Sequence, residues 1–239
     1  MMGYRHHSFD RVRLQIASGI EDSWIAALWQ DCVNTTNNRI CRWQSPGESG
    51  PEVYVKVYRR RPSHGLLKRW RPGRAIKEGN GYLEFSKRGI QTVPLIAWGE
   101  ERHWGLWQRG VVVTEAIDAI TVEEEYTAGE NVELLRDTAE LLARIHTAGL
   151  THGDPLARNF LATRPDPVPF DLPSWGKLTP SSQREDLIRF LGSMLQLTES
   201  RETTQDLLCR YADRIDNLPQ TEEDLLQESQ NYALRKKQA

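Results

Sequence analysis

The sequence predicts an α+β fold with two lobes, because a strand-rich first half is followed by a mainly helical second half. The first half contains runs of β-branched and aromatic residues, such as EVYVKVY at 52–58, that are typical of strands. From residue 131 onward, apolar residues recur at helical spacing instead. The boundary falls near residues 114–119, and we expect residues 1–117 and 118–239 to be two lobes of one domain.

The first half should contain one helix near its start and another before its last strands. Residues 21–30 (EDSWIAALWQ) have apolar residues at helical spacing, with Asp22 or Ser23 as the cap. A second helix is expected from about 74 to 88, because Gly89 follows it as a C-terminal glycine commonly does. Strand patterns occur at residues 9–18, 39–44, 52–58, 92–98 and 110–117, of which 39–44 and 52–58 should pair antiparallel.

The second half begins with the clearest helix of the chain. Residues 131–149 (NVELLRDTAELLARIHTAG) have a strong apolar stripe, with Asn131 placed as N-cap and Gly149 just past the end. FLAT at 160–163 and VPFDL at 168–172 indicate short strands. Residues 181–197 predict another helix, and the tail beyond residue 200 predicts one or two more.

Composition indicates a soluble globular protein. Of the 239 residues, 38% are hydrophobic and 27% are charged, and the formal net charge of −2 gives no overall attraction to nucleic acid. No apolar run approaches the roughly 18 residues that span a bilayer, and the N-terminus lacks the apolar core of a signal peptide. Cys32, Cys41 and Cys209 have no metal-ligand spacing, so we expect reduced thiols and a cytoplasmic protein. Most of the eight scattered tryptophans should lie in the core.

One lysine interrupts the apolar strand at 52–58. Lys56 shares a face of that strand with Tyr54 and Tyr58, because strand side chains alternate. A lone lysine of this kind usually faces water on an edge strand, and the alternative is a lysine aimed at phosphate groups. An acid on the following helix, Glu78 or Glu84, could hold it extended by an ion pair.

The stretch THGDPLARNFL at 151–161 has the spacing H-x-D-x-x-x-x-N that is typical of kinase catalytic loops. An aspartate at this point, Asp154, can accept the proton of an attacking hydroxyl, and Asn159 can ligate a metal ion. Asp171 follows twelve residues after Asn159 and supplies a carboxylate that Mg²⁺ can share with phosphate. The order of Lys56, Glu78, Asp154 and these two ligands predicts phosphoryl transfer from ATP.

In the strand at 52–58, the helix that follows it and the stretch at 151–161, the chain resembles the protein-kinase-like superfamily. The resemblance is specifically to the lipopolysaccharide kinase (Kdo/WaaP) family. The resemblance implies a bilobal protein-kinase-like fold, with a strand-rich N-lobe and a mainly helical C-lobe. It also favours Glu78 over Glu84, and it implies a sugar hydroxyl, of Kdo or heptose, on the lipid-linked lipopolysaccharide inner core as the phosphate acceptor. By the same resemblance the adenine would meet the backbone of Thr114, Glu115, Ala116 and Ile117.

The sequence departs from this family pattern in two places. No G-x-G-x-x-G precedes Lys56, and the corresponding turn would be the polar stretch from Thr35 to Asn38. Only fifteen residues separate Asp171 from Asp186, which is too short for the segment that holds a peptide in protein kinases, so we expect a non-peptide acceptor.

Three further residues have alternative interpretations. Asp186 either accepts hydrogen bonds from the catalytic-loop backbone or is an ordinary acid at a helix N-terminus. His152 should brace the loop rather than react, and His146 should pack in the apolar helix.

A basic segment runs from Lys56 to Lys77, with nine Lys or Arg residues and no acid. It is either a solvated surface or a patch that attracts an anionic glycolipid and the anionic inner face of the inner membrane. We expect no nucleic acid as partner and no metal other than Mg²⁺. The candidate substrate-binding members are Arg59, Arg60, Arg61, Lys68, Arg69, Arg71 and Arg74.

Two other functions remain open from the sequence. The chain could be a kinase-like enzyme for another small molecule or for a protein, like the RIO and Bud32 groups. It could also be a pseudokinase that binds nucleotide without transferring phosphate, because the glycine-rich loop is missing.

Overall fold

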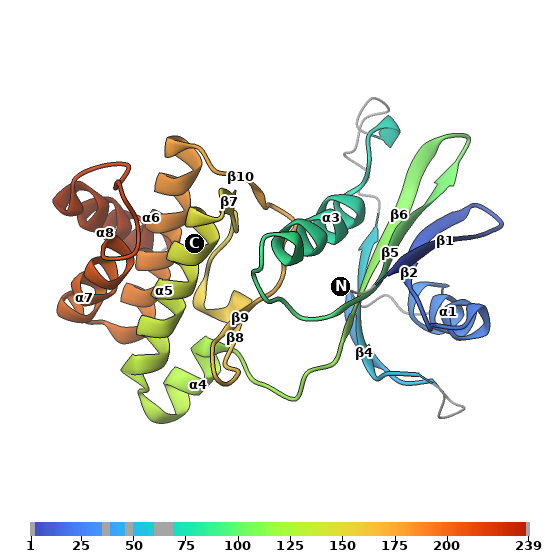
Figure 1. Cartoon of the computed structure of the whole chain (residues 1–239), viewed down its shortest axis with the longest axis horizontal. Coiled ribbons are helices and arrows are strands. Elements are labelled where there is room, and N and C mark those ends of the chain that lie inside the picture. Colours follow the sequence, from blue (N-terminus) through green and yellow to red (C-terminus); the bar gives the residue numbers. More distant parts are fainter. Residues whose placement is uncertain (1–2, 35–38, 46–49, 60–68, 238–239) are drawn as a thin grey trace. The chain divides into compact units, whose positions relative to one another are not determined.

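The computed structural model describes residues 3–34, 39–45, 50–59 and 69–237. The chain divides into two compact units, each described by itself below (Figure 1). Unit 1 contains Met1–Glu84 and Val93–Ile117, and unit 2 contains Phe85–Thr92 and Asp118–Ala239.

Unit 1 is built on a six-stranded antiparallel sheet with the strand order β1-β2-β5-β6-β4-β3 (Figure 1). The predicted pairing of 39–44 with 52–58 is confirmed, with Ile40 opposite Lys56. The strands are β1 (Tyr4–Phe9), β2 (Val12–Ala17), β3 (Ile40–Trp43), β4 (Val53–Arg59), β5 (Leu95–His103) and β6 (Leu106–Glu115).

The single strand predicted at 9–18 is wrong in its extent, because two strands meet there. Asp10 has a φ of 49° and turns the chain between β1 and β2. β1 lies at the edge of the sheet, where one face stays exposed, so its sequence YRHHSF lacks the apolar alternation of an inner strand.

The first helix, α1 (Asp22–Leu28), continues into the wider π-helical turn η1 (Trp29–Asn34). Asp22 and Ser23 are not its caps, contrary to the prediction. Glu21 is the N-cap residue, and its side chain makes no capping hydrogen bond. The Asp22 carboxylate pairs instead with Arg5 at 2.5 Å, so it is engaged by β1.

The two faces of the sheet carry different helices. Trp24, Ile25 and Leu28 of α1 belong to one core cluster with Val53 and Val55 of β4. The alternate residues of β4 face the opposite side, where α3 (Arg74–Lys87) packs and ends within one residue of the predicted point (Figure 1).

The hairpin of β5 and β6 is longer than the predicted strands at 92–98 and 110–117. Both strands extend toward a tight turn at Trp104 and Gly105. The added residues are mostly polar, so they give no strand signal in the sequence.

Unit 2 is mainly helical, as predicted for the second half. Asn131 caps α5 by accepting a hydrogen bond from the Leu134 amide at 3.2 Å. The predicted hairpin is β8 (Phe160–Leu161) with β9 (Val168–Pro169), and β7 (Leu150–Thr151) pairs with β10 (Gly176–Lys177). The helices are α4 (Val122–Gly129), α5 (Val132–Thr147), the 3₁₀ turn η2 (Ala157–Asn159), α6 (Pro180–Thr198), α7 (Arg201–Ala212) and α8 (Glu222–Lys237).

Helix α4 was not predicted, although its start has a readable signal. Thr121 and Glu124 form a capping box, in which each side chain bonds the backbone amide of the other. Three consecutive acids in its first turn dilute the apolar stripe that would otherwise mark the helix.

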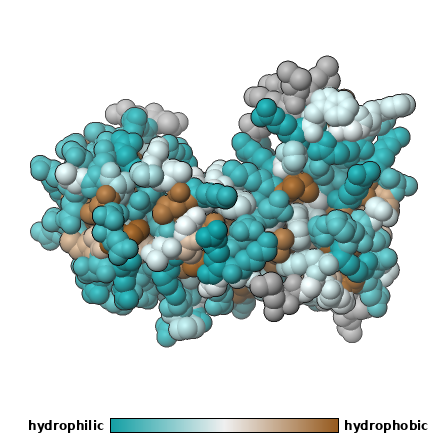
Figure 2. Space-filling view, turned by 45° about the horizontal axis from the view of Figure 1, so that its top comes forward, coloured by the Kyte–Doolittle hydropathy of each residue, from teal (hydrophilic) through white to brown (hydrophobic). Residues whose placement is uncertain are grey.

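The surface is dominated by polar residues. On the face drawn in Figure 2, hydrophobic colour is confined to small separate patches. Within the described residues, no helix is both long and apolar enough to span a bilayer.

Candidate active site

In unit 1, Lys56 and Glu78 form a half-buried ion pair. The Lys56 ammonium nitrogen lies 3.1 Å from each Glu78 carboxylate oxygen. Only 1% of the Glu78 side chain is exposed, against 21% of the Lys56 side chain. The glutamate is therefore enclosed by the protein, and the lysine is the member of the pair that a ligand can reach. The hydroxyl of Tyr58 also donates to Glu78.

The sequence brings these groups together through the packing of α3 on the sheet. A Cβ atom at Gly79 would lie 2.2 Å from the Trp98 ring, so α3 can approach the sheet this closely only with glycine there. Glu78, the preceding residue, is thereby buried against β4 and meets Lys56. Glu84, the competing candidate, lies six residues further along α3.

The segment predicted to meet adenine ends β6 and leaves the sheet. Two of its amides already donate within unit 1, from Glu115 to Pro94 and from Ala116 to Glu52, each at 2.9 Å. These bonds fix the strand end. Among the described residues, the Ile117 amide donates no backbone–backbone hydrogen bond.

In unit 2, the loop from His152 to Asn159 connects β7 to η2. The side-chain nitrogen of Asn159, Nδ2, donates to the backbone carbonyl oxygen of Asp154 at 2.8 Å. The same nitrogen lies 3.3 Å from the Asp154 carboxylate. Asn159 is buried, whereas 37% of the Asp154 side chain is exposed. The Asp154 carboxylate is therefore exposed to solvent, while its backbone is held by the buried Asn159 side chain.

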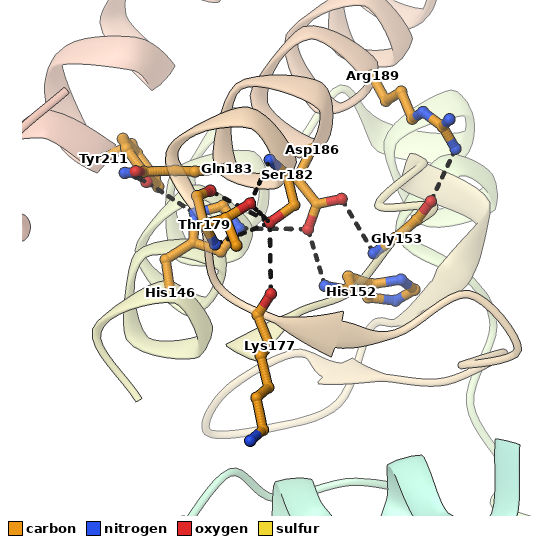
Figure 3. Close-up of polar contacts among 10 residues, drawn as sticks. All are labelled: His146, His152, Gly153, Lys177, Thr179, Ser182, Gln183, Asp186, Arg189 and Tyr211. Carbon is orange, nitrogen blue, oxygen red and sulfur yellow. Dashed lines mark hydrogen bonds and ion pairs between the residues drawn. The ribbon is translucent and has the colours of Figure 1, made fainter. Parts of the chain in front are cut away.

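Asp186 anchors this loop from α6, as one of its two interpretations predicted. One carboxylate oxygen accepts from the His152 amide at 2.8 Å and the other from the Gly153 amide at 2.9 Å (Figure 3). Asp186 is 2% exposed, so its charge is stabilised by these N–H groups rather than by water.

A buried polar network behind Asp186 was not predicted from the sequence. The His146 ring lies between the Asp186 carboxylate, at 3.2 Å, and the Tyr211 hydroxyl, at 2.7 Å (Figure 3). Gln183 donates to the same hydroxyl at 2.9 Å. Burial raises the pKa of Tyr211, so its hydroxyl stays protonated. Three helices, α5, α6 and α7, are thus tied to the loop by polar residues on otherwise apolar faces.

Arg189 was also missed by sequence reasoning. It lies one helical turn after Asp186 on α6 and donates to the Gly153 carbonyl oxygen at 2.7 Å (Figure 3). The same guanidinium nitrogen is 3.6 Å from the Asp154 carboxylate. The i, i+3 spacing from Asp186 was the available signal, because both residues then face the loop.

His152 is an internal brace, in agreement with the prediction. Its side chain is fully buried, and its ring lies 5.1 Å from the Phe160 ring. Burial is the largest influence on its pKa and lowers it, so the ring is neutral near pH 7. A buried neutral ring has no access to a reacting group.

Asp171 follows β9 and has a φ of 56°, in the left-handed region that few non-glycine residues adopt. The Phe170 amide donates to the Asn159 carbonyl oxygen at 3.0 Å, so the β8–β9 hairpin sets residues 159 and 171 at the same end. An amide oxygen and a carboxylate are hard oxygen donors that suit Mg²⁺ when phosphate completes the shell. Among the described residues, no group of three or more His, Cys, Asp or Glu side chains is arranged to hold a metal ion.

The basic segment is only partly described. Arg60, Arg61 and Lys68 lie outside the described residues, as does the turn from Thr35 to Asn38. Arg59 is half-buried and donates to the Val33 carbonyl oxygen at 3.1 Å, so part of its guanidinium serves the fold. Within the described chain Arg69, Arg71 and Arg74 form no ion pair.

Comparison with known proteins assigns the chain to a family. The model of the "Lipopolysaccharide kinase (Kdo/WaaP) family" matches residues 24–211. The chain belongs to this family. The family is named for kinases, so the chain is a phosphotransferase. No curated protein matches the chain in sequence.

Solved structures show that the fold is protein-kinase-like, as predicted. A structure titled "WaaP in complex with acyl carrier protein" is 16% identical with a TM-score of 0.60, covering 98% of this chain and 89% of that one. Aminoglycoside-3'-phosphotransferase of type VIII is 14% identical with a TM-score of 0.57, covering 87% and 100%. WbdD with the kinase inhibitor LY294002 is 16% identical with a TM-score of 0.51, covering 84% and 47%.

Helix α8 lies beyond the residues matched by the family model and packs against α6 and α7. The pKa of Tyr232 is raised chiefly by burial and further by the charge of Asp154, while Arg189 and Arg158 oppose the increase. Tyr232 also packs against Gly192 of α6. Tyr232 of α8 is therefore packed on α6, the helix that carries Asp186 and Arg189.

Proposed function

We propose that the chain is an ATP-dependent kinase that phosphorylates a sugar hydroxyl, of Kdo or heptose, on the lipid-linked lipopolysaccharide inner core. One observation carries this proposal above the others. Asp154 is half-exposed on a loop whose backbone amides donate hydrogen bonds to buried Asp186. The Asp154 carboxylate itself lies near Asn159 and Arg189. A carboxylate held in this way can accept a proton from an alcohol.

In the proposed reaction Asp154 takes the proton of the acceptor hydroxyl. The hydroxyl oxygen forms a bond to the γ-phosphorus of ATP as the bond to the β–γ bridging oxygen breaks, and ADP leaves with that electron pair. Arg189 and Asn159 keep the Asp154 carboxylate oriented, since both contact it or its backbone. Orientation of this kind lowers the barrier by holding reactants in line.

The remaining site residues would bind the nucleotide. Lys56, held by Glu78, would orient the ATP phosphates, and the backbone at 114–117 would meet the adenine. Asn159 and Asp171 would hold Mg²⁺, which neutralises charge on the phosphates when bound.

We further propose a lipid-linked acceptor that brings the protein to the inner face of the inner membrane. Arg69, Arg71 and Arg74 of the basic segment, which form no ion pair within the described residues, suit an anionic glycolipid or its leaflet. A peptide acceptor has less support, because residues 172–179 supply only the two-residue strand β10 before α6 begins.

The test is phosphate transfer from labelled ATP to isolated lipopolysaccharide precursors that differ in Kdo and heptose content, with mass analysis of the product. We expect one phosphate on the wild-type product. We expect Asp154→Asn to lose about 10²–10⁴-fold in kcat, the usual contribution of a general base. Asp166→Asn is the matched control, because Asp166 belongs to the same unit and pairs only at the surface with Arg144.

Three results would redirect the proposal. Transfer to a small sugar, an aminoglycoside or a protein, with none to the lipopolysaccharide precursor, would replace the acceptor. Nucleotide binding without any transfer would indicate a pseudokinase. Near wild-type transfer by Asp154→Asn would remove Asp154 from the reaction.

A further inference from the structure

Two tryptophans are exposed on unit 1, although most were expected in the core. Trp104 is 84% exposed and Trp70 is 61% exposed, the highest values for large hydrophobic side chains among the described residues. Trp24, Trp29, Trp98 and Trp107 are buried, so the core expectation holds for them. Trp104 forms the tip of the β5–β6 hairpin, at the periphery of unit 1 (Figure 1).

Trp104 occupies a backbone conformation that bulky residues avoid. Its φ is 54° and that of Gly105 is 75°, so both central turn residues are left-handed. Two-residue hairpin turns of this kind favour Asn-Gly, and a tryptophan in the first position is a steric outlier. A strained conformation that exposes a large apolar side chain is a reason to infer function.

Arg102 fixes Trp70 beside this tip. Its guanidinium donates to the carbonyl oxygens of Gly105 at 2.6 Å, Trp70 at 3.3 Å and Arg71 at 2.9 Å. The Trp70 ring packs so closely on the turn that a Cβ atom at Gly105 would lie 2.7 Å from it. The Trp70 indole is therefore held against the turn that carries Trp104.

The charge around the indoles is positive. The nearby acid, Glu100, is nearly buried and is matched by Arg102 at 2.6 Å and by the Gly73 amide at 2.9 Å. Arg71 and Arg74 are exposed and have no acidic partner in the described chain.

We infer that the surface formed by Trp70, Arg71, Arg74 and Trp104, the aromatic tip, docks on an anionic lipid bilayer. Tryptophan prefers the headgroup level of bilayers, and arginine is attracted to anionic lipid. The tip is a convex turn, which needs no complementary shape when the partner is a fluid surface. The inference rests on the proposed function, because a lipid-linked acceptor brings the enzyme to the bilayer.

The test is co-sedimentation of the full chain with vesicles of phosphatidylcholine, alone or mixed with phosphatidylglycerol. We expect sedimentation with the mixed vesicles only. Trp104→Asn should weaken binding about tenfold by removing the apolar side chain, while asparagine suits the turn and preserves the fold. Arg71→Ser should weaken it about fivefold. Leu234→Asn, at a side chain of 58% exposure on α8, should bind as the wild type does.

Two outcomes would overturn the inference: equal binding by Trp104→Asn and wild type, or no preference of the wild type for anionic vesicles. Loss of binding to a labelled single-stranded oligonucleotide in Trp104→Asn, without vesicle binding by the wild type, would assign the tip to nucleic acid instead.

A second assay separates this inference from the proposed function. With a deacylated, water-soluble core acceptor, Trp104→Asn should transfer phosphate at the wild-type rate. If the wild type binds anionic vesicles and transfers nothing to this acceptor or to the intact precursor, the proposed function fails and the aromatic tip stands. If transfer occurs and vesicle binding does not, only the aromatic tip fails.

Discussion

At Gly153 the backbone has a φ of 84°, and a Cβ atom would lie 2.3 Å from the Ser174 carbonyl oxygen. Gly153 immediately precedes Asp154, and Ser174 follows Asp171 by three residues. Glycine therefore allows the loop with the proposed base to approach the segment with the proposed metal ligand. In the sequence Gly153 occupies the variable position of H-x-D-x-x-x-x-N, whereas the structure gives it a steric role.

This contact predicts a large effect of Gly153→Ala. A left-handed alanine costs about 1–2 kcal/mol, and the clash with backbone adds to that cost. We expect a greater loss in the free energy of unfolding than this, measured by denaturant titration, together with a loss of kcat.

Gly89→Ala is the matched control, because Gly89 has a similar φ of 76° and nothing near its missing Cβ. It should lose only the conformational cost and keep its kcat. Equal effects of the two substitutions would show that the contact with Ser174 is unimportant.

His152 predicts a pH dependence of stability. Its folded-state pKa is lowered by burial from the ordinary 6.5, so the unfolded chain takes up a proton at a higher pH than the folded chain does. The free energy of unfolding should therefore fall as the pH drops below about 6.5, and His152 should have no effect well above it.

Denaturant titrations between pH 5 and pH 8, roughly the range in which histidine changes charge, check this prediction. His152→Phe should reduce the decrease at acidic pH, whatever its stability at neutral pH. His6→Gln is the control, because His6 is exposed on β1 and belongs to the other unit. An unchanged slope in His152→Phe would contradict burial as the cause.

The residues that sequence reasoning found and missed differ in the kind of contact they make. Lys56 and Glu78 could be predicted to pair because one strand and the next helix commonly adjoin. Arg189 contacts Asp154, and Tyr211 contacts His146, across long stretches of chain, and no periodic pattern encodes such contacts. Their roles depend on tertiary packing that only the structure shows.

At the scale of elements, α6 organises unit 2. Its residues Asp186 and Arg189 hold the catalytic loop, while its other face packs against α7 and α8. The loop itself has little regular structure, so the hydrogen bonds from α6 are a large part of what fixes its conformation.

We therefore expect Asp186→Asn to destabilise unit 2 and impair catalysis. The side-chain oxygen of an asparagine can accept from only one of the two backbone N–H groups, those of His152 and Gly153. Its NH₂ group would then face the other N–H, so two donors would meet without an acceptor. The cost should be about 1–3 kcal/mol in the free energy of unfolding, the penalty for a buried group left unsatisfied.

Asp206→Asn on α7 is the control, since Asp206 pairs with Arg136 in a partly exposed ion pair. It should cost no more than about 1 kcal/mol. A smaller loss for Asp186→Asn than for this control would show that the loop is held by other contacts.

The elements that the sequence predicted share a strong local signal. Helix α5 combines a cap, an apolar stripe and a final glycine, and β4 is apolar on its core face. β1, the outer part of β5 and β6, and the acid-rich α4 lack such a stripe because they are edges or surfaces. Their structure depends on pairing and packing with distant residues, which local pattern does not reveal.

At the scale of the whole molecule, the proposed chemistry is divided between the two units. Lys56 and Glu78, the proposed phosphate-binding pair, belong to unit 1, whereas Asp154, Asn159 and Asp171 belong to unit 2. A division of this kind predicts that nucleotide binding and phosphate transfer can be lost separately.

Thermal unfolding with and without ATP and Mg²⁺ tests this division. At about 100 times Kd the wild type should gain roughly 5–10 °C in Tm, since binding then adds about 2.7 kcal/mol. Asp154→Asn should keep most of this gain and lose turnover, because its carboxylate is proposed to meet the acceptor. Lys56→Met should lose most of the gain.

The comparison uses the change in Tm caused by nucleotide, so the stability that Lys56→Met loses by leaving Glu78 buried without its cation does not affect the result. Lys177→Met, at an exposed lysine of unit 2, should behave as the wild type. Omission of Mg²⁺ should reduce the gain if Asn159 and Asp171 hold the ion. A full gain in Lys56→Met would mean that the nucleotide binds without the Lys56–Glu78 pair, and the division of roles between the units would have to be abandoned.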